Sequence, residues 1–222
     1  MAAPSEGTRV PRVSGIVPDP RHSASVRIQV GGRTLLTVPL DVVNEERIGP
    51  GDPLLPAVHE RLCRAADAEA AFRTALRCLE RRPFARWDLA RRLVLRGHPP
   101  EASEQAVLRA ESAGLLNDEA FTRHFVQTRA ARGRGPARLR RELTSFGVAA
   151  SLVERIIAEE LPEDTTRAAV RALAKKRAGQ LSSLDPLVRF RRVVAYLARR
   201  GYRGAEVRAI ALDALKESPP TE

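Results

Sequence analysis

From residue 56 onward, apolar residues recur every three or four positions, the spacing typical of amphipathic helices. One pattern occurs three times: an apolar residue, an apolar residue four positions later, and a glycine four positions after that. The three copies are Leu89-Leu93-Gly97, Leu139-Leu143-Gly147 and Val193-Leu197-Gly201. In each copy the apolar pair lies one turn apart on a helix face, and the glycine can adopt the left-handed conformation that ends a helix.

Each copy of the pattern has a helical segment before it and another after it, which predicts a repeated three-helix module. Residues 153, 156 and 157 follow Gly147 at the same offsets at which residues 207, 210 and 211 follow Gly201, and all six are apolar. We expect a mainly α-helical protein with three tandem three-helix modules in an elongated row, over residues 56–117, 118–162 and 163–217. A short tail, 218–222, would follow. A single irregular bundle with accidental spacing is the alternative.

The N-terminal quarter of the chain follows a different pattern. Val26, Ile28 and Val30 alternate with polar residues before Gly31-Gly32, and a second apolar run ends at Pro39. Alternation on both sides of a Gly-Gly pair predicts a β-hairpin. We therefore expect a small N-terminal β-hairpin and a turn-rich linker over residues 25–55. Residues 1–24 contain four prolines and read as a flexible leader.

Positive charge is concentrated in particular segments. The net charge is +11 over 222 residues, and because only three of the 38 basic residues are lysines, 35 are arginines. Residues 120–147 hold seven arginines against one acid, and residues 167–208 hold twelve basic residues against two acids. This distribution suggests a polyanionic partner, either nucleic acid or an acidic protein surface. The arginine bias of a GC-rich genome is the competing explanation.

The sequence lacks the motifs of common catalytic and metal sites. It contains no P-loop, no dinucleotide-binding glycine motif and no HExxH. Its four histidines have no ligand spacing, and Cys63 and Cys78 form no zinc motif. We therefore expect no enzymatic activity, metal or cofactor. Two free thiols and the lack of a long apolar run predict a cytoplasmic protein without a membrane span.

The most specific stretch runs from Gly114 to Gly147. It reads Gly-Leu-Leu-Asn-Asp before Phe121, then a basic run over 129–134, then Gly135-Pro136 and a helix ending at Gly147. This order resembles the RecX family of bacterial recombinase regulators, and the resemblance extends over roughly residues 70–215. It implies tandem three-helix modules that bind the RecA recombinase filament on single-stranded DNA. The implied effect is to restrain ATP hydrolysis, strand exchange and filament growth in recombination, DNA repair and the SOS response.

The first predicted module departs from the family pattern at two places. Ala85-Arg86-Trp87 stands where a capping residue usually precedes the second helix, and Ser103 stands where an aliphatic residue is expected. Proline at the start of the helix after Gly97 is compatible with a first helical turn. These departures concern the details of the first module.

The candidate surface for RecA and DNA consists of arginines that point away from the apolar helix faces or extend the same surface at the helix ends. They are Arg91, Arg92, Arg96, Arg129, Arg134, Arg138, Arg140, Arg141, Arg191, Arg192, Arg199 and Arg200. Arginines at helix C-termini also suit the helix dipole without any ligand.

We expect a monomer whose partners are the RecA filament, single-stranded DNA and, as a further candidate, duplex DNA. The alternative function is a helical DNA-binding protein that acts alone, for instance in transcription, with the third helix of a module as recognition helix. The acidic character of residues 153–160 argues against groove entry by that helix of the second module.

Overall fold

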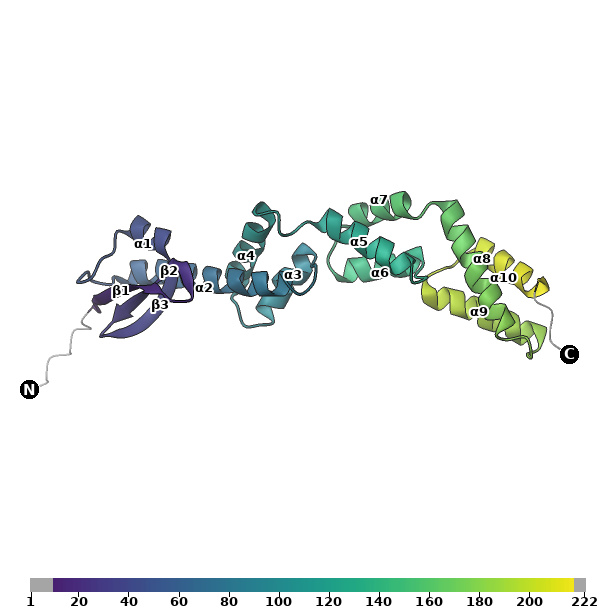
Figure 1. Cartoon of the computed structure of the whole chain (residues 1–222), viewed down its shortest axis with the longest axis horizontal. Helices are drawn as coiled ribbons and strands as arrows, with labels where there is room; N and C mark the ends of the chain where they lie inside the picture. Colours follow the sequence, from purple (N-terminus) through teal and green to yellow (C-terminus); the bar gives the residue numbers. More distant parts are fainter. Residues whose placement is uncertain (1–9, 218–222) are drawn as a thin grey trace, which may run out of the picture. The chain divides into compact units, whose positions relative to one another are not determined.

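The computed structural model describes residues 10–217 and is mainly α-helical, with a small antiparallel sheet at its N-terminal end (Figure 1). Two compact units make up the chain. The first contains the residues up to Arg82 together with Leu89–Leu116, and the second contains Pro83–Asp88 and the residues from Asn117 onward. None of the helices within 10–217 is both long and apolar enough to span a membrane.

The sheet consists of β1 (Val13–Asp19), β2 (His22–Val30) and β3 (Arg33–Pro39) in the order β1-β2-β3. The predicted hairpin is present as β2 and β3. Its turn residues Gly31 and Gly32 have φ angles of 57° and 76°, a conformation that glycine adopts without steric cost. A short helix, α1 (Leu40–Glu46), follows β3.

The prediction of a flexible leader over residues 1–24 is wrong from residue 13 onward, where β1 adds a third strand to the hairpin. Val13 is 1% exposed and belongs to the core formed with Val26, Ile28 and Val38. The prolines suggested disorder, but only Pro18 lies within β1, and an edge strand tolerates a proline because one side of the strand has no partner strand. Residues 1–9 of the leader and the tail at 218–222 lie outside the described residues.

The first unit is built around the long helix α2 (Pro56–Leu79). Leu62, near its start, packs into the core of the sheet. Its later turns pack on α4 (Pro100–Ser112), where small residues such as Ala71, Ala75 and Ala106 are buried. Helix α3 (Arg86–Val94) lies between them in sequence, and the division between the two units falls within it.

In the second unit, α5 (Asp118–Ala130), α6 (Pro136–Ser145) and α7 (Ala150–Glu160) form one three-helix module. The Asn117 side chain caps α5 by accepting a hydrogen bond from the backbone N–H of Ala120. The core contains the residues that the apolar spacing selected, among them Leu139, Leu143 and Ile156.

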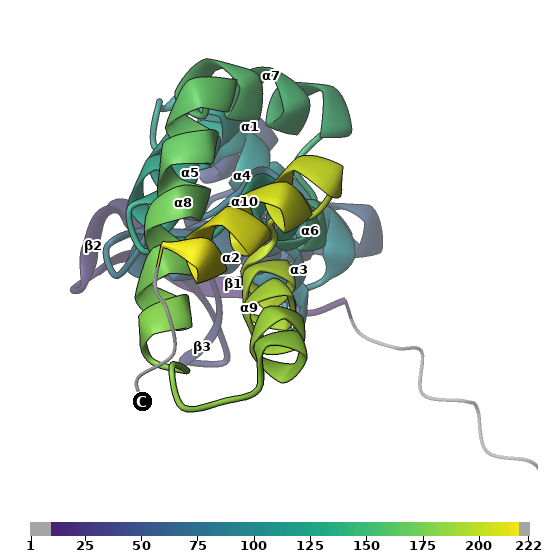
Figure 2. The ribbon, with the colours of Figure 1, turned by 90° about the vertical axis from the view of Figure 1, so that its right-hand side faces the viewer.

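The last module consists of α8 (Glu163–Gly179), α9 (Pro186–Arg200) and α10 (Ala205–Lys216). Figure 2 shows α10 lying across α8 and α9, and all three helices pack on one another. Asp185 caps α9, with Pro186 in its first turn.

The threefold pattern is confirmed. All six apolar residues of its copies are fully buried, and the three glycines have φ angles of 90°, 75° and 96°. The predicted mainly α fold, with tandem three-helix modules after a small β element, is therefore present.

Candidate functional site

The candidate arginines of the first unit lie on and just after α3. The apolar side chains of Leu89 and Leu93 are buried, whereas Arg91, Arg92 and Arg96 are exposed on the helix surface. The guanidinium groups of Arg92 and Arg96 make no hydrogen bond or ion pair with any residue between 10 and 217. They are therefore available to an external anion.

Four candidate arginines of the second unit are exposed in the same way. Arg141 lies on α6, and Arg191, Arg192 and Arg199 lie on α9. Within the described part of the chain, their side chains have no ion-pair partner. We call these four residues the exposed arginine set.

Other candidate arginines bind carboxylates of the protein itself. Arg138 Nε donates to Glu142 Oε1 at 2.8 Å, and Arg134 binds the other oxygen of the same carboxylate. Arg140 Nε lies 2.7 and 2.9 Å from the two oxygens of Glu154 on α7. Burial alone would raise the pKa of Glu142, but the hydrogen bonds from Arg138 and Arg134 outweigh burial and lower that pKa. These arginines thus stabilise the module.

The turn between α5 and α6 joins the two modules of the second unit. The N–H groups of Gly135 and Ala137 donate to the carbonyls of Arg200 and Gly201 at 2.6 and 3.2 Å. The Arg200 side chain donates back to the carbonyl of Arg132 at 3.0 Å. The Gly-Arg-Gly-Pro turn is therefore a backbone joint, and Arg200, a candidate for an external partner, forms part of it.

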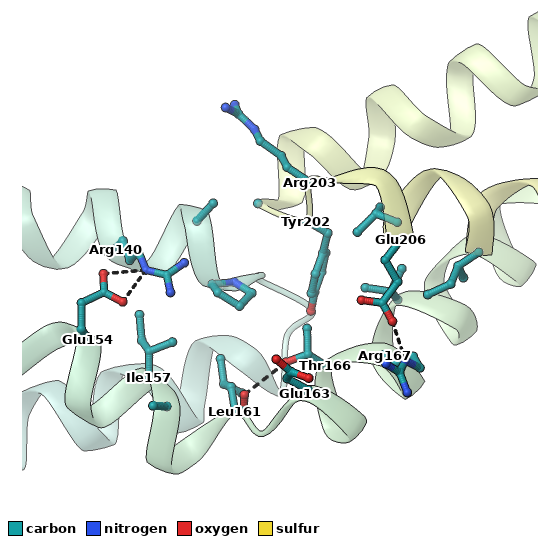
Figure 3. A pocket seen from close by; sticks show the side chains of 17 residues that line it. Arg140, Glu154, Ile157, Leu161, Glu163, Thr166, Arg167, Tyr202, Arg203 and Glu206 are labelled. Atoms are coloured by element: carbon teal, nitrogen blue, oxygen red, sulfur yellow. Dashed lines mark hydrogen bonds and ion pairs between the residues drawn. The ribbon is translucent and has the colours of Figure 1, made fainter.

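A cavity of about 440 Å³ lies beside this joint, between α6–α7 and α8–α10 (Figure 3). Its apolar wall includes Ile157, Leu161 and Tyr202, and burial raises the pKa of the Tyr202 hydroxyl. Its charged lining comprises three arginines and three glutamates: Arg140, Arg167, Arg203, Glu154, Glu163 and Glu206. Because these charges cancel and two of the pairs are direct ion pairs, the cavity has no preference for an anion.

The acidic residues of α7 are largely neutralised by arginines of its own module. Arg123 of α5 binds Glu159 at 2.8 Å and also binds Glu160, while Arg155 binds Glu119 at 2.7 Å. The outer surface of this module is therefore less acidic than the sequence of α7 suggests.

The twelve candidates leave out several basic residues that are exposed and have no ion-pair partner within residues 10–217. They are Arg132, Arg171, Lys176, Arg203 and Arg208. The charge count over residues 167–208 included four of them. These residues were not predicted because they lie outside the adjacent arginine pairs that recur on the second helix of each module. The remaining candidate, Arg129, lies over the ring of Phe125, 5.3 Å from its centroid.

Comparison with known proteins identifies relatives of both modules in the second unit. Residues 117–156 match the family model for the second three-helix domain of RecX, and residues 165–210 match the model for the third. Regulatory protein RecX of Halorhodospira halophila is 35% identical over 146 residues, which cover 66% of this chain and 89% of the relative. The Streptomyces coelicolor protein of the same name is 36% identical over 151 residues, covering 67% and 79%.

Solved structures share the fold. A crystal structure of regulatory protein RecX superposes with a TM-score of 0.74 at 19% identity and covers 91% of this chain and 99% of that one. RecX from Lactobacillus salivarius superposes with a TM-score of 0.59 at 16% identity, over 68% and 97% of the two chains.

Proposed function

Because the chain belongs to the RecX family of regulatory proteins, we propose that it binds the RecA recombinase filament on single-stranded DNA and restrains it. The restraint acts on ATP hydrolysis, strand exchange and filament growth during recombination, DNA repair and the SOS response. On this proposal the protein is a cytoplasmic monomer that needs no cofactor and catalyses no reaction.

The exposed arginine set supports this proposal because its side chains can contact the phosphates of a nucleoprotein filament. Arg191 and Arg192 are adjacent on α9, and Arg141 on α6 belongs to the other module of the same unit. Arginine side chains that are not engaged by the protein's own carboxylates can bind phosphate oxygens with two parallel hydrogen bonds. A protein that holds such groups against a nucleoprotein filament can occlude incoming duplex DNA without any chemical step.

The structure changes the choice of residues for a test. Charge reversal at Arg138 or Arg140 would break the ion pairs with Glu142 and Glu154, so that lost activity would be confused with lost stability. Arg191 and Arg192 make no such contacts within the described chain. The informative variant is therefore Arg191→Glu/Arg192→Glu.

The test is the rate of DNA-dependent ATP hydrolysis by RecA with far less than one copy of this protein per recombinase subunit. We expect the unaltered protein to inhibit strongly and the double variant to inhibit at least about tenfold less, since each charge reversal replaces a phosphate contact with repulsion. The matched control is Arg33→Glu/Arg47→Glu, which makes the same charge change at exposed positions of the first unit whose side chains, like those of Arg191 and Arg192, have no ion-pair partner within residues 10–217. An equal loss of inhibition in both variants would contradict the assignment of Arg191 and Arg192 to the contact surface.

The competing function, a DNA-binding protein that acts alone, predicts a different outcome. It requires salt-sensitive binding to duplex DNA of defined sequence and no effect on RecA. Helix α7 is a poor recognition helix because Glu154, Glu159 and Glu160 occupy it, and their ion pairs with Arg140 and Arg123 engage the nearby arginines that could otherwise bind phosphate. Absence of inhibition at every ratio of protein to recombinase would favour this alternative over the proposal.

A further inference from the structure

A second cavity, of about 390 Å³, lies in the first unit, apart from the exposed arginine set in sequence. It is bounded by the turn between β1 and β2, by β2, β3 and α2, and by the segment after α3. Four arginines line it: Arg21, Arg27, Arg73 and Arg77. Its volume falls in the lower part of the ~300–1,000 Å³ range of ligand sites, which is enough for a phosphate group with the sugar that carries it.

One carboxylate, that of Asp19, lines the cavity together with these four arginines. Asp19 is 6% exposed and binds Arg27 at 2.8 Å through Oδ1, while Arg73 lies 3.7 Å from Oδ2. With the lining histidines neutral, four arginines and one aspartate leave a net charge of +3. Glu69, which does not line the cavity, binds both Arg73 at 3.0 Å and Arg109 at 2.8 Å, so it offsets part of the charge of Arg73. It leaves the side chains of Arg21 and Arg77 without a carboxylate partner within residues 10–217.

Two of the arginines are held in place by the protein. Arg27 donates to Asp19 through both Nε and Nη2, and Arg73 donates to Glu69 and, at 2.7 Å, to Ser25. Such contacts fix the guanidinium groups before any ligand arrives, which lowers the entropy cost of binding. The remaining positive charge of the cavity lining is therefore held in a fixed position beside the sheet.

The other two arginines have free hydrogen-bond donors. Among the described residues, Arg77 uses only Nη2, which donates to the Thr74 hydroxyl at 2.9 Å, and the Arg21 guanidinium makes no hydrogen bond or ion pair. The Thr74 hydroxyl donates to the carbonyl of Ala70 and lies 2.9 Å from His98 Nε2. This contact holds the His98 ring against the cavity.

We propose that this cavity is a binding site for a phosphate group, with Arg21 and Arg77 as direct contacts and Arg27 and Arg73 as fixed positive charges behind them. The phosphate can belong to a DNA strand or to a small phosphate compound, since both present the same oxygens to the guanidinium groups. The proposal goes beyond the proposed function and is independent of it, because it concerns the first unit and requires no recombinase.

The test measures binding of inorganic phosphate to the full chain by calorimetry, with chloride at equal ionic strength as reference. We expect saturable binding that Arg21→Gln/Arg77→Gln weakens at least about tenfold, the effect of losing charge-assisted hydrogen bonds. The matched control Arg33→Gln/Arg64→Gln removes the same charge elsewhere in the first unit and should bind as the unaltered protein does. Arg21→Gln alone breaks no contact and serves if the double variant is unstable.

A second arm distinguishes the two sources of phosphate. A short single-stranded oligonucleotide is titrated with and without free phosphate as competitor. Competition that the double variant abolishes identifies a DNA phosphate as ligand, whereas phosphate binding without competition identifies a small compound. The proposal is overturned if phosphate does not bind saturably, or if the control variant loses binding to the same extent. Neither result depends on inhibition of RecA.

Discussion

Among single residues, Arg189 has a role that sets it apart from its basic neighbours. It is 3% exposed, and its Nε and Nη2 donate to the carbonyl of Ala178 at 3.0 and 2.8 Å. Ala178 lies in the last turn of α8, where carbonyl groups lack helical partners and the helix dipole is negative. Arg189 therefore ties the start of α9 to the end of α8.

Replacement of Arg189 by methionine should destabilise the last module. The change removes both guanidinium donors from the buried Ala178 carbonyl, which keeps only the N–H of Leu181 at 3.1 Å among the described residues, and we expect the free energy of unfolding to fall by about 1–3 kcal/mol. Urea denaturation followed by circular dichroism measures this change. Arg191→Met, at an exposed position two residues away, is the control and should change stability by less than about 0.5 kcal/mol. Similar losses for both variants would contradict the role of Arg189.

Ser103, one of the departures from the family pattern, is buried at 1% exposure, and its hydroxyl has no hydrogen-bond partner in the described chain. We expect Ser103→Ala to raise the free energy of unfolding by about 1 kcal/mol, because it removes an unsatisfied buried hydroxyl. Ser112→Ala on the same helix is the control, since the Ser112 hydroxyl donates to the carbonyl of Leu108. Thermal melting compares the two variants. An equal rise in melting temperature for Ser112→Ala would mean that the gain comes from the helix propensity of alanine and not from the unsatisfied hydroxyl.

Between elements, the α5–α6 turn lies in close contact with the end of α9. A Cβ atom on Gly135 would lie 2.7 Å from the Tyr202 ring and 2.8 Å from the carbonyl carbon of Gly201. Because one of these neighbours is backbone, it cannot move aside without separating the two modules.

Gly135→Ala should therefore destabilise the second unit by about 1–3 kcal/mol, the usual cost of overpacking. Gly179→Ala is the matched control, since a Cβ there meets nothing within 4 Å and alanine favours a helix. Differential scanning calorimetry should show a lower melting temperature for the first variant and an unchanged or higher one for the control. An unchanged melting temperature for Gly135→Ala would show that the contact between the α5–α6 turn and the end of α9 can adjust to a methyl group at little cost.

The ion pairs between α5 and α7 predict a direction for acid denaturation. Hydrogen bonds from Arg155 and Arg123 lower the pKa of Glu119, and hydrogen bonds from Gln127 and Arg123 lower that of Glu160, both from an ordinary value of 4.5. A carboxyl group whose pKa is lower in the folded state stabilises the fold above its ordinary pKa. That contribution is lost as the pH falls through the lowered value.

The carboxyl groups of Glu119 and Glu160 should therefore raise the melting temperature by a constant amount above about pH 5, and by less as the pH falls below it. Glu119→Gln/Glu160→Gln should melt at a lower temperature at pH 7 and lose less on acidification than the unaltered protein. Melting curves between pH 7 and pH 3 provide the comparison. Equal slopes for the two proteins would mean that the network does not control the acid response.

For the molecule as a whole, the net charge of +11 makes affinity for DNA dependent on salt. Each phosphate contact on a single strand contributes about −0.7 to the slope of log affinity against log salt concentration. If Arg191 and Arg192 each contact a phosphate, Arg191→Gln/Arg192→Gln should make the slope shallower by about 1.4. Fluorescence anisotropy over a series of potassium chloride concentrations measures it. An unchanged slope would place DNA elsewhere on the protein.

Much of the helical fold could be predicted from sequence because its signals are local. The apolar pairs, the caps at Asn117 and Asp185 and the glycines that end helices act within a few residues of chain. Strand β1 was missed because its partners are supplied by β2 and its prolines resemble those of a disordered segment.

For the candidate site, the sequence predicted only that positive charge is concentrated in particular segments, not which arginines remain exposed and unpaired. Arg134, Arg138 and Arg140 could not be told from Arg141 by type or spacing, yet the first three bind glutamates and the last is exposed. The cavity of about 390 Å³ in the first unit collects side chains from residues 19 to 98, which no short motif links.

By itself, the sequence determined where several helices end, that helices repeat in threes, and that positive charge is concentrated in particular segments. These properties follow from the helix period and from composition, which require no knowledge of distant contacts. Only the tertiary structure decided which guanidinium groups bind carboxylates of the protein and which remain for a partner. An ion pair such as that between Arg123 and Glu160, 37 residues apart, depends on how the chain returns on itself.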